Sequence, residues 1–508
     1  MKGSKLIIIF HYFYSEMTES EELNKNENKN EKYIEDKLNE IGAFGNYQKL
    51  MMLMMLVLSG LPAMSIYFTV FNLAQPNLIC KNILTNETIE NNKVCDAWNH
   101  INKLKEENSK TTQEFECEFE KTYYGKTLKT DWKMYCGREY LSGLTQTIYL
   151  VGTVCAIFNG YFGDRFGRRK SIIFFLIIIG SSLLISQILI SNFMNISVTA
   201  KYIIYTINQF IIGIFAYCLY VTSYLLLIES TTQAYRTLFS NIHLSIYVFG
   251  EFFVLIPSYL WKDWEINNWI LLGVTVISIL ISIVFLNESP RWLISQNRPK
   301  DALVVLKKIA IVNRKQLNLN NESIELKDKD SENSIQESFT KEEKLDMKLM
   351  FKQICFPVKS NLIKLILLTG VWLSLNLLYY GVSLGVTSID SINPYLMYIF
   401  SSIAEFLGYM LCIINDKIGR RRALIIYFLI SGIICLVVSF IPRNEDLDDN
   451  SKVIADAAII ITLVSIGKCM ASAAFNTCYL FTAEFYPTNV RNFAFSFISC
   501  IGNVGKIE

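Results

Sequence analysis

Long apolar segments alternate with polar connections along most of this chain. Segments of roughly 20 mostly apolar residues lie at 49–74, 140–162, 171–191, 200–228, 237–260, 268–287, 361–385, 393–414, 423–441 and 453–481, and another begins near 493. A helix of about 20 residues crosses a hydrocarbon core of about 30 Å, and in lipid its backbone groups must pair within the helix. The pattern therefore predicts an all-α polytopic membrane protein embedded in a lipid bilayer.

The composition agrees with this prediction. Hydrophobic residues make up 52% of the 508 positions and charged residues only 19%, which is too apolar for a soluble protein of this size. The three histidines are far apart and no phosphate-binding glycine loop is present. We therefore expect no enzyme activity, no metal or other cofactor, no ATP-driven movement and no nucleic-acid partner.

The placement of Lys and Arg predicts the orientation in the membrane. The short connections at 164–170 and 417–422 are dense in these residues, whereas those at 192–199 and 386–392 contain none. Cytoplasmic loops carry an excess of Lys and Arg. We therefore expect the first two connections and the tail at 1–48 to be cytosolic.

This orientation makes the loop at 75–139 extracellular. Its four cysteines are Cys80, Cys95, Cys117 and Cys136, which in an oxidising compartment form two disulfides with three possible pairings. Sequons for N-glycosylation begin at Asn86 in this loop and at Asn195 in another outer connection.

Two polar motifs occur twice, at offsets of 252 and 255 residues. One lies in short turns between spans and comprises Gly160, Asp164, Arg165, Gly167, Arg168 and Arg169 in the first copy and Asp416, Gly419, Arg420 and Arg421 in the second. The other pairs Glu229 with Arg236, and later Glu484 with Arg491. Such a repeat predicts two six-helix bundles, at 49–287 and 361–508, which alternate about a central site. The polar linker at 288–360 should begin with a short amphipathic helix at Pro299–Val312.

The acidic residue of each motif is not explained by loop orientation. Asp164 and Asp416 are expected to pair with a helix N-terminus or a cation across the boundary between the bundles, in one state only. We interpret the repeated residues as a conformational latch. The alternative is a basic loop that only sets the topology.

Candidate substrate-binding residues lie inside the spans. Glu405 is a candidate counter-charge for a cation or a proton site, since intramembrane charges are costly and should face a wet cavity; a structural pair with a Lys such as Lys468 is the alternative. Further candidates are Tyr217, Tyr220 and Tyr224, which share one helix face, and Trp372 and Tyr379. These rings could bind an organic cation or simply pack.

Several segments share one resemblance: Gly42–Gln48, the cysteine-containing loop, Glu288–Leu293, Tyr379-Tyr380-Gly381 and the segment from Tyr479 to Arg491. Together they resemble the organic cation, anion and zwitterion transporters of solute carrier family 22, within the major facilitator superfamily. The resemblance covers the chain from roughly residue 33 onward. It implies the major facilitator fold, a plasma-membrane location and alternating-access transport of small organic ions. Sugar porters share Glu288-Ser289-Pro290-Arg291, so a sugar or polyol porter stays open.

The resemblance also places Asn503 where family members often carry a charge that sorts substrates. Only 17 residues follow Arg491, so we expect a chain truncated within the eleventh helix, and a membrane protein that binds without transporting is a further alternative. Glu405 and the tyrosine face favour cations. The coupling ion and the oligomeric state stay open.

Overall fold

The computed structural model confirms an all-α membrane architecture. It describes residues 32–76, 78–82, 88–89, 95, 115–119, 123–191, 196–316, 359–385, 393–440, 450–485 and 488–506. Within these ranges, nine helical segments are long and apolar enough to cross a membrane. All agree with predicted spans to within a few residues.

The N-terminal half contains six spans. They are α2 and α3 (Asn46–Leu58 and Gly60–Asn72), α6 and α7 (Tyr140–Cys155 and Asn159–Phe166), α8 (Arg168–Ile190), α9 (Val198–Glu229), α10 (Arg236–Leu260) and α11 (Trp264–Phe285). The C-terminal half contains α15 (Lys359–Gly385), α16 (Pro394–Leu411), α18 (Arg420–Ser439), α19 (Asn450–Phe485) and α20 (Thr488–Gly502). The helix α16 carries Glu405 and three tyrosines and is not among the nine segments.

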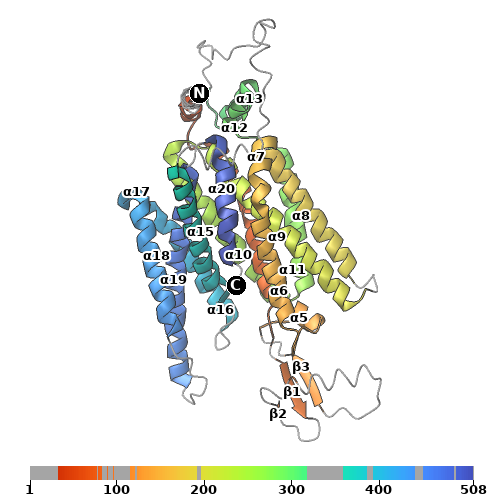
Figure 1. Ribbon diagram of the computed structural model, residues 1–508. Coiled ribbons are helices and arrows are strands. Elements are labelled where there is room, and N and C mark those ends of the chain that lie inside the picture. Colours follow the sequence, from red (N-terminus) through yellow and green to blue (C-terminus); the bar gives the residue numbers. More distant parts are fainter. Residues whose placement is uncertain are drawn as a thin grey trace, which may run out of the picture.

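Each half packs around its own central helices (Figure 1). In the N-terminal half, α8 and α6 pack against α9 and α3 packs against α10. In the C-terminal half, α16 and α18 pack against α19 and α20 packs against α15. The two halves meet where α10 contacts α16 and where α20 contacts α7. Any site between the halves is therefore formed by α3, α6, α9 and α10 on one side and α15, α16, α19 and α20 on the other.

The repeated turn motif has the same local structure in both copies. A short 3-10 helix, Ala156–Phe158 or Cys412–Ile414, leads into α7 or into α17 (Asn415–Ile418). Each copy then turns at a glycine with positive φ, 94° at Gly167 and 88° at Gly419. Residues other than glycine rarely adopt this conformation, which explains why the motif needs glycine there. The next helix begins directly after it, as α8 or α18.

The loop between the first two spans contains a small antiparallel sheet. Its strands are β1 (Leu78–Asn82), β2 (Thr88–Ile89) and β3 (Phe115–Phe119), in the order β2-β1-β3. Of the three possible pairings, the structure has Cys80–Cys117 and Cys95–Cys136. Cys80 and Cys117 are opposite each other in the β1–β3 register. The sequon residues Asn86 and Asn195 lie outside the described residues.

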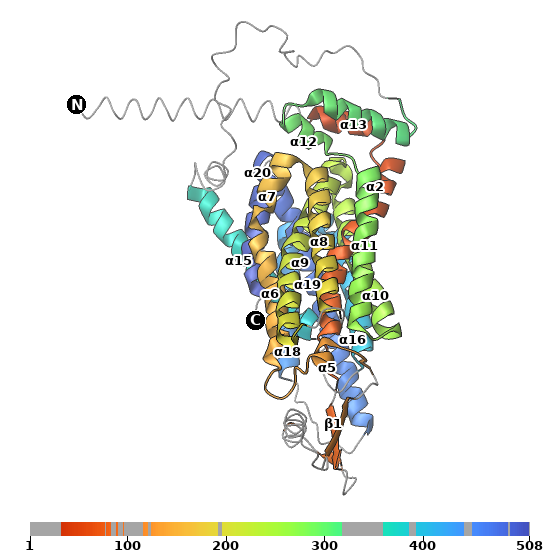
Figure 2. The ribbon, with the colours of Figure 1, turned by 90° about the vertical axis from the view of Figure 1, so that its right-hand side faces the viewer.

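The opposite end of the molecule carries the start of the linker (Figure 2). Here α12 (Pro290–Ser295) is followed by α13 (Pro299–Val312), the amphipathic helix predicted from the sequence. Its apolar residues join the core together with Ile34 and Leu38, so part of the predicted tail is folded. Below, the two ends of the molecule are called the sheet end and the α13 end.

Candidate functional site

A cavity with aromatic walls lies between the two halves. The space between its wall residues, its openings to solvent included, is about 500 Å³. Its wall is formed by Pro62, Ile66, Tyr149, Thr153, Tyr217, Tyr220, Tyr247, Tyr379, Tyr380, Tyr409, Phe475 and Tyr479. Both halves contribute to this wall, and tyrosine is its main component. The cavity can therefore offer π faces and hydroxyl groups to a small ligand.

The structure places only some of the predicted substrate residues in this wall. Tyr217, Tyr220 and Tyr379 line the cavity as expected. Tyr224, one turn further along α9, is not part of the wall; its hydroxyl is 3.1 Å from Ser240 Oγ, and its ring packs against Tyr479. The shared face on α9 thus divides into two residues at the cavity and one in the packing beside it.

Trp372 and Asn503 also lie outside the wall. The indole N–H of Trp372 donates to Thr482 Oγ1 at 2.9 Å, and its ring packs against Tyr479, which does line the cavity. Asn503 is buried, and its Nδ2 donates to the carbonyl of Thr153 at 3.3 Å. This bond links the C-terminal half to the N-terminal half. Trp372 supports the wall, and Asn503 contributes to the contact between the halves.

Glu405 is paired with Lys468, which was the alternative to a free counter-charge. The Lys468 Nζ lies 2.7 Å from Glu405 Oε2, and both side chains are at most 1% exposed. The phenols of Tyr379 and Tyr409 donate to Glu405 Oε1 from the cavity wall. Lys468 Nζ also lies 3.7 Å from the ring centroid of Tyr379. A carboxylate and an ammonium group therefore stand directly behind two cavity tyrosines.

A second buried carboxylate, Glu251, bridges the halves beside the cavity. Ser402 Oγ of α16 donates to Glu251 Oε2 of α10 at 3.0 Å. Glu251 lies one helical turn beyond Tyr247, which lines the cavity. The contact of Glu251 with the other half could not be predicted from the sequence.

Contacts between the halves lie on both sides of the cavity along α10. Towards the sheet end, the Tyr395 hydroxyl lies 3.0 Å from the carbonyl of Ser258, and its ring stacks on Phe71 at 5.5 Å. Towards the α13 end, Asn476 Nδ2 donates to Asn241 Oδ1 at 2.7 Å. The helix α10 therefore contacts the other half at Asn241 and at Ser258, and between these two contacts its Tyr247 lines the cavity.

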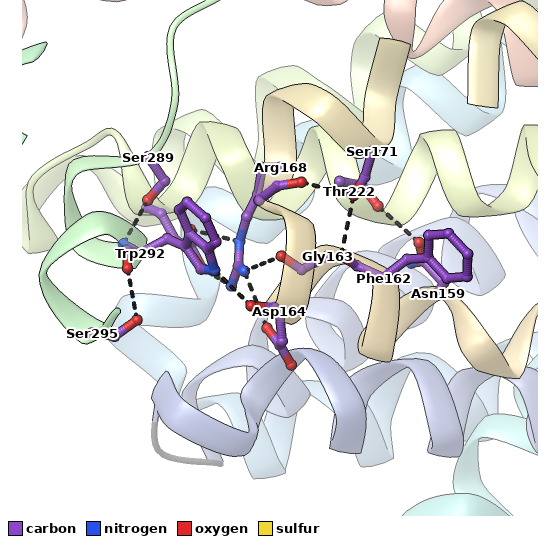
Figure 3. A network of polar contacts seen from close by, with 12 residues as sticks. Asn159, Phe162, Gly163, Asp164, Arg168, Ser171, Thr222, Ser289, Trp292 and Ser295 are labelled. Atoms are coloured by element: carbon purple, nitrogen blue, oxygen red, sulfur yellow. Dashed lines mark hydrogen bonds and ion pairs between the residues drawn. The ribbon is translucent and has the colours of Figure 1, made fainter. Parts of the chain in front are cut away.

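The first copy of the repeated motif forms a buried charge cluster at the α13 end (Figure 3). Arg168 lies 3.1 Å from Asp164 Oδ1 and donates two hydrogen bonds to Glu229, at 3.1 and 2.9 Å. It also donates to the carbonyl of Gly163 at 2.6 Å. These described ion pairs lie within the N-terminal half. Across the boundary between the halves, α20 packs against α7, which carries Asp164. Pairing of Asp164 across that boundary stays a prediction.

Glu288 and Trp292 complete this cluster, although no role was predicted for them from the sequence. Glu288 Oε1 accepts a hydrogen bond from the backbone N–H of Arg168 at 2.8 Å, which satisfies an otherwise free N–H at the start of α8. Burial raises the pKa of Glu288, and hydrogen bonds from backbone N–H groups partly oppose this rise. The Trp292 indole donates to the carbonyl of Asp164 at 2.9 Å. The segment that resembled the transporter family thus holds the latch motif together.

The other predicted latch residues have varied surroundings. Arg165 is exposed and lies over the Tyr161 ring at 5.5 Å, and Arg169 donates to the carbonyl of Ile283 at 2.8 Å. Arg236 is the first residue of α10. In the second copy Arg421 is exposed. The side chains of Asp416, Glu484 and Arg491 lie outside the described part of the structure.

Comparison with known proteins supports the resemblance. The profile of the family described as "Sugar (and other) transporter" matches residues 91–507. Solute carrier family 22 member 21 of Mus musculus is 27% identical over 77% of this chain and 64% of its own length. Organic cation transporter protein of Drosophila melanogaster is 24% identical over 93% of this chain and 85% of its own length. The chain thus spans less than two thirds of the first of these curated relatives. These proteins are transporters rather than enzymes, as we expected.

Solved structures show the same fold. The proton:xylose symporter XylE, bound to 6-bromo-6-deoxy-D-glucose, superposes with a TM-score of 0.57 at 15% identity, covering 90% of this chain and 87% of that one. The human organic anion transporter MFSD10 superposes with a TM-score of 0.51 at 12% identity, covering 90% of this chain and 91% of that one. Both comparisons identify the major facilitator fold.

Proposed function

The chain belongs to the sugar (and other) transporter family, and from this premise we propose that it moves small organic cations across a membrane by alternating access. The aromatic cavity between its halves carries the proposal. Contacts flank this cavity at both ends, so opening one set while keeping the other would expose it to one side at a time.

The chemistry of the wall supports a cationic substrate. A cation over an aromatic face gains about 0.5–2 kcal/mol, more when water is excluded. The position of Lys468 Nζ over the Tyr379 ring is an example of this contact at the edge of the site. The hydroxyl groups of Tyr379 and Tyr409 donate hydrogen bonds to the Glu405 carboxylate. These hydrogen bonds increase the negative charge on the two phenol rings. These rings therefore attract a cation more strongly than isolated tyrosines.

The balance of buried charge points in the same direction. Glu251 and Glu405 stand behind the wall, and Lys468 pairs with Glu405. Among the described residues lining the cavity there is no Lys or Arg. An organic anion would thus have no direct cationic partner in this part of the wall.

The names of the relatives suggest both cations and carnitine. Organic cation/carnitine transporter 2 of Mus musculus is 26% identical over 77% of this chain. We further propose that the chain lies in the plasma membrane with the α13 end in the cytosol, because the Arg-rich turns are at that end.

Uptake of tetraethylammonium, carnitine, para-aminohippurate and glucose into proteoliposomes tests the proposal. We expect saturable uptake of tetraethylammonium that Tyr220→Ala weakens, because Tyr220 lines the cavity. Tyr140→Ala is the matched control, since Tyr140 is 68% exposed at the start of α6. Uptake of para-aminohippurate or glucose without tetraethylammonium would contradict the cation preference. No uptake of any probe would contradict transport itself.

A further inference from the structure

Glu251 is a buried carboxyl group, and the transport proposal does not specify whether it carries a proton. It lies in the middle of α10, and its side chain is 2% exposed. It accepts a hydrogen bond from Ser402 of the opposite half and also interacts with the hydroxyl group of Tyr67 of its own half. The group is therefore buried when the halves meet, and separating the halves breaks the hydrogen bond from Ser402. The burial and hydrogen bonding of the Glu251 carboxyl group therefore change when the transporter opens and closes.

Among the described residues, the one cation that faces Glu251 is already paired with another carboxylate. The titratable groups that face it from the packed helices are Tyr67 of α3, Tyr379 and Tyr380 of α15, Tyr398 and Glu405 of α16, and Lys468 of α19, together with Tyr247 of its own helix. Lys468 is the only positive group among these described residues, and it is bound to Glu405 at 2.7 Å. The two carboxyl groups thus share one ammonium group.

An ionised carboxyl group buried without a partner is costly, and such groups take up a proton instead. A protonated Glu251 can still accept the Ser402 hydrogen bond at Oε2, because only one of its oxygens carries the proton. The closed, empty cavity therefore favours the neutral acid. When one end opens, water reaches the site and the proton can leave to that side.

We propose that Glu251 is a proton-binding site and that the transporter exchanges one proton for one organic cation. This inference rests on the proposed function. A cation in the cavity, one helical turn from Glu251, supplies the positive charge that the proton supplies in the empty state. The loaded transporter can then close with Glu251 ionised, and the empty transporter closes with Glu251 protonated. One positive charge moves in each direction, so the exchange is electrically neutral.

The test uses the full chain in proteoliposomes, with tetraethylammonium as the probe and the membrane potential held at zero. For one-to-one exchange, each pH unit of acidity inside should raise the steady-state accumulation roughly tenfold. Glu251→Gln imitates the protonated acid permanently, so its accumulation should not depend on the pH gradient. Glu139→Gln is the matched control, because Glu139 is exposed at the start of α6, and it should retain the full dependence.

The outcomes separate this inference from the proposed function. Uptake by the unaltered protein that ignores the pH gradient, or a Glu251→Gln variant that still follows it, would overturn proton exchange while leaving transport intact. No uptake of any probe would contradict the proposed function. In that case infrared spectroscopy of the purified protein still tests the proton site. We expect a carbonyl band of a protonated carboxyl group at neutral pH that Glu251→Gln removes, and an unchanged band would overturn the assignment.

Discussion

Replacing Glu405 while keeping its partner Lys468 should destabilise the protein strongly. In Glu405→Gln, the ammonium group of Lys468 stays buried and loses its carboxylate, retaining Ser383 Oγ and the Tyr379 ring. Removing one partner of a buried pair costs about 3–5 kcal/mol. For a domain of roughly 150–250 residues, each kcal/mol lowers Tm by about 2–4 °C, so the expected loss is roughly 6–20 °C.

The reverse substitution should cost less. In Lys468→Met, the Glu405 carboxylate keeps the phenol donors of Tyr379 and Tyr409, so we expect a loss near the lower end of that range. Replacing both residues removes both buried charges, and such double replacements are often neutral or stabilising. The double variant Glu405→Gln/Lys468→Met should therefore recover most of the lost stability.

An exposed ion pair provides the control for this series. Lys126 and Glu265 also lie 2.7 Å apart, but their side chains are 40% and 44% exposed. Exposed pairs contribute about 0–1 kcal/mol, so Glu265→Gln should change Tm little. The assay is the apparent Tm of purified protein in detergent, followed by fluorescence-detected size exclusion. The reasoning fails if Glu405→Gln is no less stable than Glu265→Gln, or if the losses of the two single variants add up in the double variant.

Three further predictions concern other parts of the molecule. Asp164→Asn should lower the uptake rate with little change in surface expression, because Glu229 still holds Arg168 by two hydrogen bonds; equal uptake per molecule at the surface would disprove a latch role. Tyr220→Ala should raise the KM for tetraethylammonium roughly fivefold, equivalent to about 1 kcal/mol of lost cation–π attraction, and an unchanged KM would exclude this contact. Cys80→Ser should lower the free energy of unfolding by about 4 kcal/mol, since the Cys80–Cys117 disulfide closes a loop of 37 residues. Surface biotinylation should then show less protein, and unchanged surface levels would contradict this.

Hydropathy was enough to predict the spans, but it did not predict which face of each helix points toward the cavity. The sequence identified Tyr217 and Tyr220 because they share a helix face, but Tyr224 on the same face lies where the halves touch. Tyr149, Tyr247, Tyr409 and Tyr479 line the cavity and were not predicted. Each comes from a different helix, and which side of a buried helix faces a cavity depends on packing against its neighbours. A tyrosine count alone could not distinguish these positions from ordinary core residues.

The contact partners of the buried polar residues and of the cysteines were harder to predict than the segments in which these residues lie. The cost of intramembrane charge identified Glu405 and suggested Lys468 as its alternative partner, and the structure has that pair. The contact of Glu251 with Ser402 depends on how the halves meet, which no local pattern specifies. The disulfide pairing likewise required the β1–β3 register, because spacing permits all three connections.

Alternating access is the central claim. Distances between pairs of spin labels, measured by pulsed electron paramagnetic resonance, test it most directly. One pair, on Tyr259 and Leu396, spans the halves at the sheet end, and the other, on Leu238 and Ile413, spans them at the α13 end; all four side chains are exposed. The labels require a background in which the free cysteines are replaced by serine. We predict that the two distances change in opposite directions when tetraethylammonium is added. Distances that rise and fall together, or do not change at all, would contradict the account.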